Sequence, residues 1–154
     1  MSTRARFALI GAAIVAAACA PAVPGAATGF EDVSIADARD LPTNFASREG
    51  RPGPNGGTVY DSISEPIDDG VAYRFDLGHC GLYSPVDLDG SFWDAIGGTA
   101  STGETLDLDT DGEMINATSG AIVVIGDEMR FRTASGSVVR FERHPGEKEF
   151  PGCD

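Results

Sequence analysis

The sequence predicts a small all-β domain, an antiparallel meander that closes as a sandwich or partial barrel, behind a disordered N-terminal segment. Two observations predict this fold. From residue 71 onward apolar and polar side chains alternate with a period of two, and Gly-containing turns separate the apolar runs. We divide the chain into residues 1–18, 19–30, 31–64 and 65–154, and we assign the β domain to the last segment. That segment is long enough for one hydrophobic core.

Residues 1–18 have the organisation of an export signal. Arg4 and Arg6 form a basic start, and the apolar run Phe7–Ala18 has the length of a signal-peptide core and is short for a membrane span. Small residues directly before Cys19 resemble the bacterial lipobox, whose cysteine carries a diacylglyceryl group after cleavage. We therefore expect a lipoprotein, anchored through Cys19 on the outer face of the cytoplasmic membrane. The alternative is ordinary signal cleavage after Ala20, which would give a secreted protein.

Residues 19–30 are rich in Pro, Ala and Gly, and we expect a flexible spacer there. Residues 31–64 are expected to be irregular and peripheral. Within them, residues 33–41 predict a short helix that stops before Pro42, and the Pro- and Gly-rich residues 48–57 predict a loop.

The chain has three cysteines, Cys19, Cys80 and Cys153. Either cleavage route removes Cys19 from the thiol pool, and the remaining even pair in an oxidising compartment predicts a Cys80–Cys153 disulfide. The bond would close a loop of about seventy residues and contribute about 4 kcal/mol in the chain-entropy model. It would also hold down residues 144–154, which have little apolar content. His79 and Cys80 are neighbours in an extended segment and should point to opposite faces, which argues against a Cys-His dyad.

Period-two patterns predict the strands of the sheet. Val71, Tyr73, Phe75 and Leu77 fall on one face of a first strand. Further strands are expected over residues 121–125, 128–133 and 137–143, joined by a two-residue turn at 126–127 and a three-residue loop at 135–137. This register places Ile122 opposite Phe131, Val124 opposite Met129, Phe131 opposite Phe141, Thr133 opposite Val139, and Arg130 opposite Glu142. One face then carries six apolar side chains: Ile122, Val124, Met129, Phe131, Val139 and Phe141.

The charge of the chain excludes some partners. The formal net charge is −13, and removal of residues 1–18 takes away two of the 11 basic residues and none of the 24 acidic ones, so the mature charge is −15. Such a surface repels nucleic acid and anionic lipid head groups, and we expect neither as a partner. The membrane contact is expected through the lipid on Cys19 alone.

An acidic run offers the one candidate metal site. Asp107, Asp109, Asp111 and Gly112 reproduce the opening of a calcium-binding loop, but the twelfth position is Thr118, where a bidentate Glu belongs. Leu106 and Leu108 alternate with the acids, which is also typical of a strand entering an Asp-Gly turn. A weak calcium site is therefore kept as an alternative, and no other cofactor is expected.

Residues 87–90, "DLDG", favour a hairpin turn of type I′, and Pro85 places the strand before it at a sheet edge. Phe92 and Trp93 are consecutive, so in a strand they lie on opposite faces. One packs in the core, and the other is either covered by residues 30–70 or exposed for recognition. We name Trp93 and Tyr83 as the candidate recognition aromatics.

Two further kinds of site, a zinc site and an anion site, are considered from the histidines and arginines. His79 and His144 could join Cys80 and Cys153 around zinc only if the thiols were reduced, which export disfavours. Arg130, Arg132 and Arg140 alternate on an outer face and are typical of a solvated strand, although they could bind an anion. No catalytic triad order, phosphate loop or dinucleotide motif is present in the sequence.

Three segments carry a resemblance to known proteins: residues 72–94, "AYRFDLGHCGLYSPVDLDGSFWD", residues 112–120, "GEMINATSG", and residues 142–154, "ERHPGEKEFPGCD". They resemble a group of small exported or lipid-anchored proteins of actinobacteria and related bacteria. The resemblance covers roughly residues 65–154, implies export and the domain boundary, and implies no activity. The terminal segment contains Cys153, as pairing with Cys80 would require.

We therefore expect a non-enzymatic, lipid-anchored envelope domain that binds or contacts an unknown envelope ligand. A weak calcium-binding module and an envelope hydrolase are the alternatives. The hydrolase would need a cleft that gathers His79 or His144 with two carboxylates.

Overall fold

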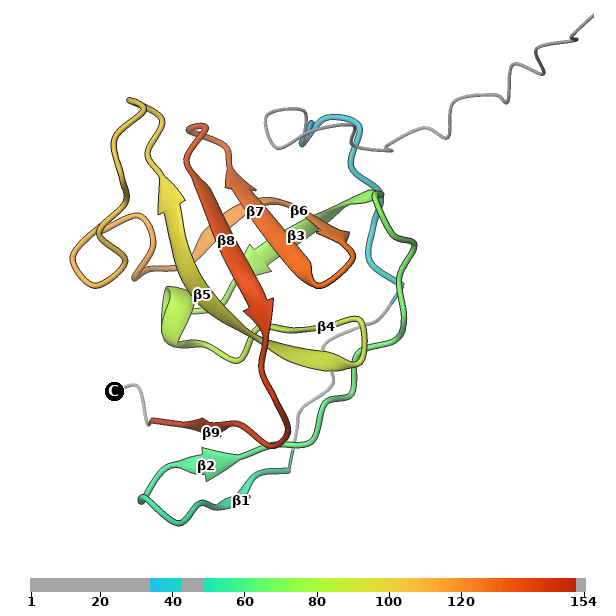
Figure 1. Cartoon of the computed structure of the whole chain (residues 1–154), viewed down its shortest axis with the longest axis vertical. Coiled ribbons are helices and arrows are strands. Elements are labelled where there is room, and N and C mark those ends of the chain that lie inside the picture. Colours follow the sequence, from blue (N-terminus) through green and yellow to red (C-terminus); the bar gives the residue numbers. More distant parts are fainter. Residues whose placement is uncertain (1–33, 43–48, 152–154) are drawn as a thin grey trace, which may run out of the picture.

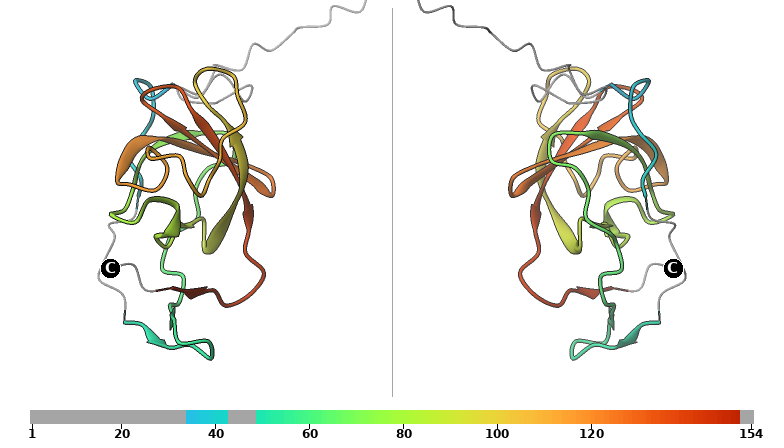
Figure 2. Two further views of the ribbon diagram at one scale, coloured as in Figure 1. Left: turned by 90° about the vertical axis from the view of Figure 1, so that its left-hand side faces the viewer. Right: turned by 90° about the vertical axis from the view of Figure 1, so that its right-hand side faces the viewer.

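The computed structural model describes residues 34–42 and 49–151. Within these residues the protein is all-β, as predicted. A six-stranded antiparallel sheet, of order β3-β6-β7-β8-β5-β4, curls into a half-barrel, and a three-stranded sheet, of order β1-β2-β9, lies at one end of it (Figures 1 and 2). The elements are β1 (Arg51–Pro52), β2 (Thr58–Val59), β3 (Ala72–Leu77), the 3-10 turn η1 (Gly81–Tyr83), β4 (Asp87–Leu88), β5 (Ser91–Thr99), β6 (Thr118–Ile125), β7 (Glu128–Thr133), β8 (Val138–Arg143) and β9 (Glu149–Phe150).

The concave side of the half-barrel holds the main core. The predicted inward face of β3 is confirmed, because Val71 and Tyr73, Phe75 and Leu77 are all buried there. The six apolar residues predicted to share a face on β6, β7 and β8 are buried in the same cluster. Phe75 on β3 contacts Phe131 on β7 in an edge-to-face arrangement, with ring centroids 6.1 Å apart, so the side chains of these two strands belong to one core.

The predicted register is right for the first hairpin and wrong for the second. Ile122 pairs with Phe131 as expected, but Phe131 pairs with Val139, and Phe141 pairs with Met129. The β7–β8 loop spans residues 134–136, one residue earlier than predicted, because Thr133 and Ser137 hydrogen-bond through both backbone and side chain. Each residue of β7 therefore pairs with a residue of β8 that lies two positions earlier than predicted. A shift of two residues keeps every side chain on its predicted face.

This shift changes the charge pairing on the outer face. Arg130 lies opposite Arg140, and Glu128 lies opposite Glu142, so the predicted Arg130–Glu142 pair is wrong. Glu128 instead contacts both arginines, with Arg130 Nε at 2.6 Å and Arg140 Nη2 at 2.7 Å. Hydrogen bonds from Arg140 and Arg130 lower the pKa of Glu128 below its ordinary value.

The "DLDG" hairpin is confirmed. Asp89 and Gly90 form the turn between β4 and β5 with φ angles of 53° and 70°, as type I′ geometry requires. β4 is an edge strand of the larger sheet, as Pro85 predicted.

The predicted short helix before Pro42 is wrong over the residues described. Residues 35–37 form a turn, and Arg39 then lies along β3. The Arg39 N–H donates to Ala72 O at 2.9 Å, and Arg39 O accepts from the Arg74 N–H at 2.7 Å. The free edge of β3 offers backbone partners that outweigh the weak local helix preference. Ala38 also covers the outer face of the sheet in a small cluster with Ala72, Ala121 and Val123.

The segment expected to be peripheral is partly built into the domain. β1 and β2 lie within residues 31–64, and β2 is the central strand of the smaller sheet, with Val59 buried. Its other neighbour, β9, belongs to residues 144–151, which we call the C-terminal tail. Residues far apart in the sequence thus meet at this end of the half-barrel (Figure 1). Within the described ranges, no helix has the length and apolar character needed to cross a membrane.

Candidate recognition pocket

A pocket of about 230 Å³ lies between the smaller sheet and η1. We call it the Tyr83 pocket. Its walls are Thr58, Tyr60, Cys80, Tyr83, Ser84, Pro85, Phe150 and Pro151. Aromatic rings, prolines and hydroxyl groups form the lining, and none of the eight side chains carries a carboxylate, an ammonium or a guanidinium group. In a chain with 24 acidic residues, this uncharged surface is a local exception.

Tyr83 is placed by the tight turn that follows β3. Gly81 has a φ of 52°, and a Cβ atom at this position would lie 2.2 Å from Met114 O, so only glycine fits. The backbone here is also bonded to the neighbouring loop, because the Leu82 N–H donates to Met114 O at 2.9 Å. Tyr83 is left 47 % exposed at the end of this turn. The sequence prediction of Tyr83 as an accessible aromatic agrees with its position.

The C-terminal tail forms the opposite wall. Phe150 is buried, with its ring centroid 5.1 Å from that of Phe92 and 5.8 Å from that of Tyr60. Glu149 contacts the β1–β2 loop: its carboxylate accepts from Gly57 N at 2.7 Å, Asn55 N at 3.0 Å and Asn55 Nδ2 at 2.9 Å. Backbone N–H groups that converge on a carboxylate in this way make a small anion-binding loop, and the protein's own tail fills it.

The tail begins at a charged cluster on β5. Asp94 Oδ2 lies 2.6 Å from His144 Nδ1, and Asp94 Oδ1 lies 2.6 Å from Lys148 Nζ. Lys148 Nζ also donates to Trp93 O at 2.9 Å, and Arg51 pairs with Glu147. Partial burial tends to raise the pKa of Asp94, but the bonds from Lys148 and His144 outweigh it, and the net pKa lies below the ordinary value of 3.8.

Trp93 is not a recognition residue, and that prediction is corrected. It is 1 % exposed and faces the core, while Phe92 on the opposite face is covered by Phe150 of the tail, so neither ring of the pair reaches solvent. The indole Nε1 donates to Leu88 O at 2.9 Å, and the guanidinium carbon of Arg143 lies 4.4 Å from the ring centroid.

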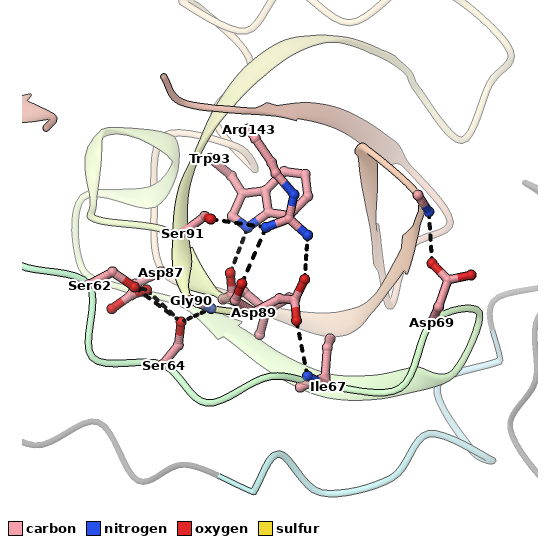
Figure 3. A network of polar contacts seen from close by, with 12 residues as sticks. Ser62, Ser64, Ile67, Asp69, Asp87, Asp89, Gly90, Ser91, Trp93 and Arg143 are labelled. Atoms are coloured by element: carbon pink, nitrogen blue, oxygen red, sulfur yellow. Dashed lines mark hydrogen bonds and ion pairs between the residues drawn. The ribbon is translucent and has the colours of Figure 1, made fainter. Parts of the chain in front are cut away.

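Arg143 belongs to a polar network that fastens residues 62–67 to the β4–β5 hairpin (Figure 3). It pairs with Asp89 and donates to Ser91 Oγ at 3.0 Å. Asp87, which is 1 % exposed, accepts from Ser62 Oγ and Ser64 Oγ at 2.6 Å each and from Ile63 N at 2.8 Å. The sequence assigned Asp87 and Asp89 only to a turn, because nothing local indicates a partner about twenty residues away.

The three predicted calcium ligands lie in the loop between β5 and β6. Asp107 Oδ1 accepts from Asp109 N at 3.2 Å, and Asp111 Oδ1 accepts from Glu113 N at 3.1 Å, so the carboxylates close local turns. Hydrogen bonds from Thr110, which have the larger effect, and from the Asp109 N–H lower the pKa of Asp107. Among residues 34–42 and 49–151 no group of three or more His, Cys, Asp or Glu side chains could hold a metal ion. The loop also has no strand where Leu106 and Leu108 alternate with the acids.

The two histidines have different surroundings. His79 is exposed beside Cys80, whereas His144 contacts Asp94 and, through Nε2, Glu147 O at 3.2 Å. Cys19 and Cys153 lie outside the described residues. Asp94, Lys148 and Tyr60 were missed by the sequence analysis, because each gains its role only when strands distant in sequence meet.

Comparisons with protein families, with characterised proteins and with solved structures find no match to this chain. The resemblance to small exported actinobacterial proteins therefore stays a prediction.

Proposed function

We propose that this protein is a lipid-anchored, non-enzymatic recognition domain of the bacterial cell envelope, which binds a small uncharged group at the Tyr83 pocket. The observation that carries the proposal is the position of Tyr83. Among the residues described, it is the only exposed aromatic side chain, and it lies on the rim of the one pocket that also gathers Tyr60 and Phe150. An accessible aromatic beside a concavity is a usual anchor for recognition.

The lining suggests a neutral sugar unit as the ligand. At about 230 Å³ the pocket is smaller than the 300–1,000 Å³ usual for whole ligands, so it would take one ring of a longer molecule. A sugar ring has an apolar C–H face, which suits Tyr83, and a rim of hydroxyl groups, which suits the hydroxyls of Ser84 and Thr58. The uncharged lining favours a neutral ring, and the negative net charge of the chain disfavours an anionic one.

The non-enzymatic assignment is supported by the histidines. The ring nitrogens of His144 contact Asp94 and the carbonyl of Glu147, and neither histidine is among the residues that line the Tyr83 pocket, so the lining contains no imidazole base. His79 is exposed and lies on the strand-to-turn connection after β3.

The anchor and the disulfide complete the proposal. Lipidation of Cys19 would place the domain on the outer face of the cytoplasmic membrane, with secretion as the alternative. Pairing of Cys80 with Cys153 is supported by the tail, since Pro151, two residues before Cys153, lines the same pocket as Cys80. Intact mass of the protein from membranes tests both: we expect the acyl chains on Cys19 and a deficit of two hydrogen atoms. A mass that matches the uncleaved chain, together with alkylation of Cys80 and Cys153, would contradict export.

Binding is tested by NMR titration of the oxidised protein with chitotetraose, a neutral oligosaccharide, and with tetragalacturonic acid, an acidic one of equal length. We expect shifts around Tyr83 with the neutral sugar only, and their loss in Tyr83→Ala. Ile63→Ala is the matched control, because Ile63 is exposed to a similar degree and lies outside the pocket lining. Shifts that survive in Tyr83→Ala, or no shifts with chitotetraose, would overturn the proposed site.

A further inference from the structure

The hydrogen bonds of His144 have an unusual requirement. Its Nδ1 lies 2.6 Å from Asp94 Oδ2, and its Nε2 lies 3.2 Å from Glu147 O. A carboxylate and a carbonyl both accept hydrogen bonds, so each ring nitrogen has to donate. Neutral imidazole carries one N–H and can satisfy only one of the two partners, whereas imidazolium carries two and satisfies both.

The position of His144 gives this requirement a consequence. Its backbone N–H donates to Phe92 O at 2.9 Å, so the start of the tail is fixed on β5. Glu147 O lies three residues further along the tail. The residues that follow it are Lys148, which contacts Asp94, and Glu149, which contacts the β1–β2 loop. Phe150, which lines the Tyr83 pocket, comes next. When the imidazole is neutral, a lone pair faces either a carbonyl or a carboxylate oxygen, and the weaker contact at Glu147 O is the one expected to open.

We propose that His144 acts as a pH-sensitive latch: protonated, it holds the C-terminal tail against β5 and keeps the wall of the Tyr83 pocket closed, and deprotonated, it loosens that wall. The consequence for ligand binding rests on the proposed function, whereas the movement of the tail does not. His144 is thus a positioning residue for Phe150 and Pro151, which supply the wall.

Charged groups from β5, β8 and the tail itself surround the latch. Asp94 faces the ring from β5, and Glu142 lies opposite Asp94 on β8. Lys148 shares the Asp94 carboxylate with His144, while the Glu147 side chain is directed to Arg51. Arg143, the preceding residue, is directed to Asp89 and the Trp93 ring. Because the pKa of Asp94 lies below 3.8, this carboxylate stays charged at about pH 5.5 and above.

Amide hydrogen exchange of the oxidised full chain at about pH 5.5 and about pH 8.5, corrected for intrinsic rates, tests the latch on either side of ordinary histidine titration. We expect the protection of residues 147–150 to fall roughly tenfold at the higher pH in the wild type. His144→Gln should show no such change, since glutamine does not titrate. His79→Gln is the matched control, because it removes the other histidine of the chain and should keep the response.

The imidazole nitrogen shifts of wild-type His144 give an independent readout that needs no variant. Both nitrogens should be protonated at about pH 5.5, and loss of one proton should coincide with the change in tail protection. Equal protection at both pH values, or a response that persists in His144→Gln, would overturn the latch. These measurements contain no sugar, so a failure of the latch is distinguishable from a failure of the binding site.

Discussion

The imidazole of His144 and the carboxylate of Asp94 lie 2.6 Å apart and join the end of β8 to β5 where the C-terminal tail begins. Lys148 reaches the same carboxylate from the other side of the tail turn. Asp94 therefore contacts two side chains, His144 and Lys148, that flank residues 145–147, and its charge decides how firmly the tail is held.

Asp94 predicts a loss of stability in acid. Its folded pKa is depressed below 3.8, so its contribution is present above that value and is lost as pH falls through the lower, folded pKa. Thermal unfolding followed from about pH 6 down to about pH 2 should show a smaller acid-dependent loss in Asp94→Asn than in the wild type. Asp61→Asn, at an exposed acid, should behave like the wild type. Identical acid profiles in all three proteins would remove Asp94 from this role.

Trp93 and Tyr83 should respond to truncation in opposite ways. Trp93 is fully enclosed, so Trp93→Ala should destabilise the fold by about 3–5 kcal/mol through cavity formation and the loss of its contact with Arg143. Tyr83→Ala should change the free energy of unfolding by less than about 0.5 kcal/mol, as at most surface positions. Urea denaturation gives both values. A large loss of stability on removing Tyr83 would show that the residue is structural and would weaken its assignment to recognition.

Asp87 tests whether the network in Figure 3 stabilises the domain. Asp87→Asn replaces one acceptor oxygen with a donor that faces the donors of Ser62, Ile63 and Ser64, at a cost of about 1–3 kcal/mol. Hydrogen exchange should show that residues 62–64 lose protection first. Ser91→Ala, in the Arg143 part of the same network, is the control and should leave residues 62–64 protected. Unchanged exchange in Asp87→Asn would mean that other contacts fasten this segment.

Gly81 links the fold to the pocket. Gly81→Ala places a methyl group against the carbonyl of Met114 and requires a left-handed backbone in a residue with a side chain, so we expect a cost above about 1 kcal/mol. Gly90→Ala is the comparison, since its φ is also positive but nothing lies within 4 Å of the added carbon. NMR shifts of Tyr83 should move in the first variant and stay in the second. If both variants are equally destabilised, backbone strain alone accounts for the effect.

Several elements could be predicted from the sequence because the residues that specify them are close together in the chain. Alternation placed Val71, Tyr73, Phe75 and Leu77 on the inward face of β3, because side chains of a strand alternate between two faces. The pair Asp89-Gly90 predicted a type I′ turn because Asp and Gly tolerate the positive φ angles that this turn requires. Pro85 predicted that β4 lies at a sheet edge. At the β7–β8 loop, which Thr133 closes with Ser137, alternation predicted the correct face for each side chain but the wrong pairing between the strands.

Contacts between segments that are distant in the sequence could not be predicted in this way. The pairing of β2 with β9 brings the C-terminal tail to the Tyr83 pocket, and no periodicity reports which strand edges will meet. Burial of Trp93 and exposure of Tyr83 depend on what packs above each ring. The role of Asp94 depends on His144 and Lys148, which lie about fifty residues away in the sequence. Periodicity records which face of a strand is apolar, whereas partners are selected by packing, charge and hydrogen bonding once the chain has closed.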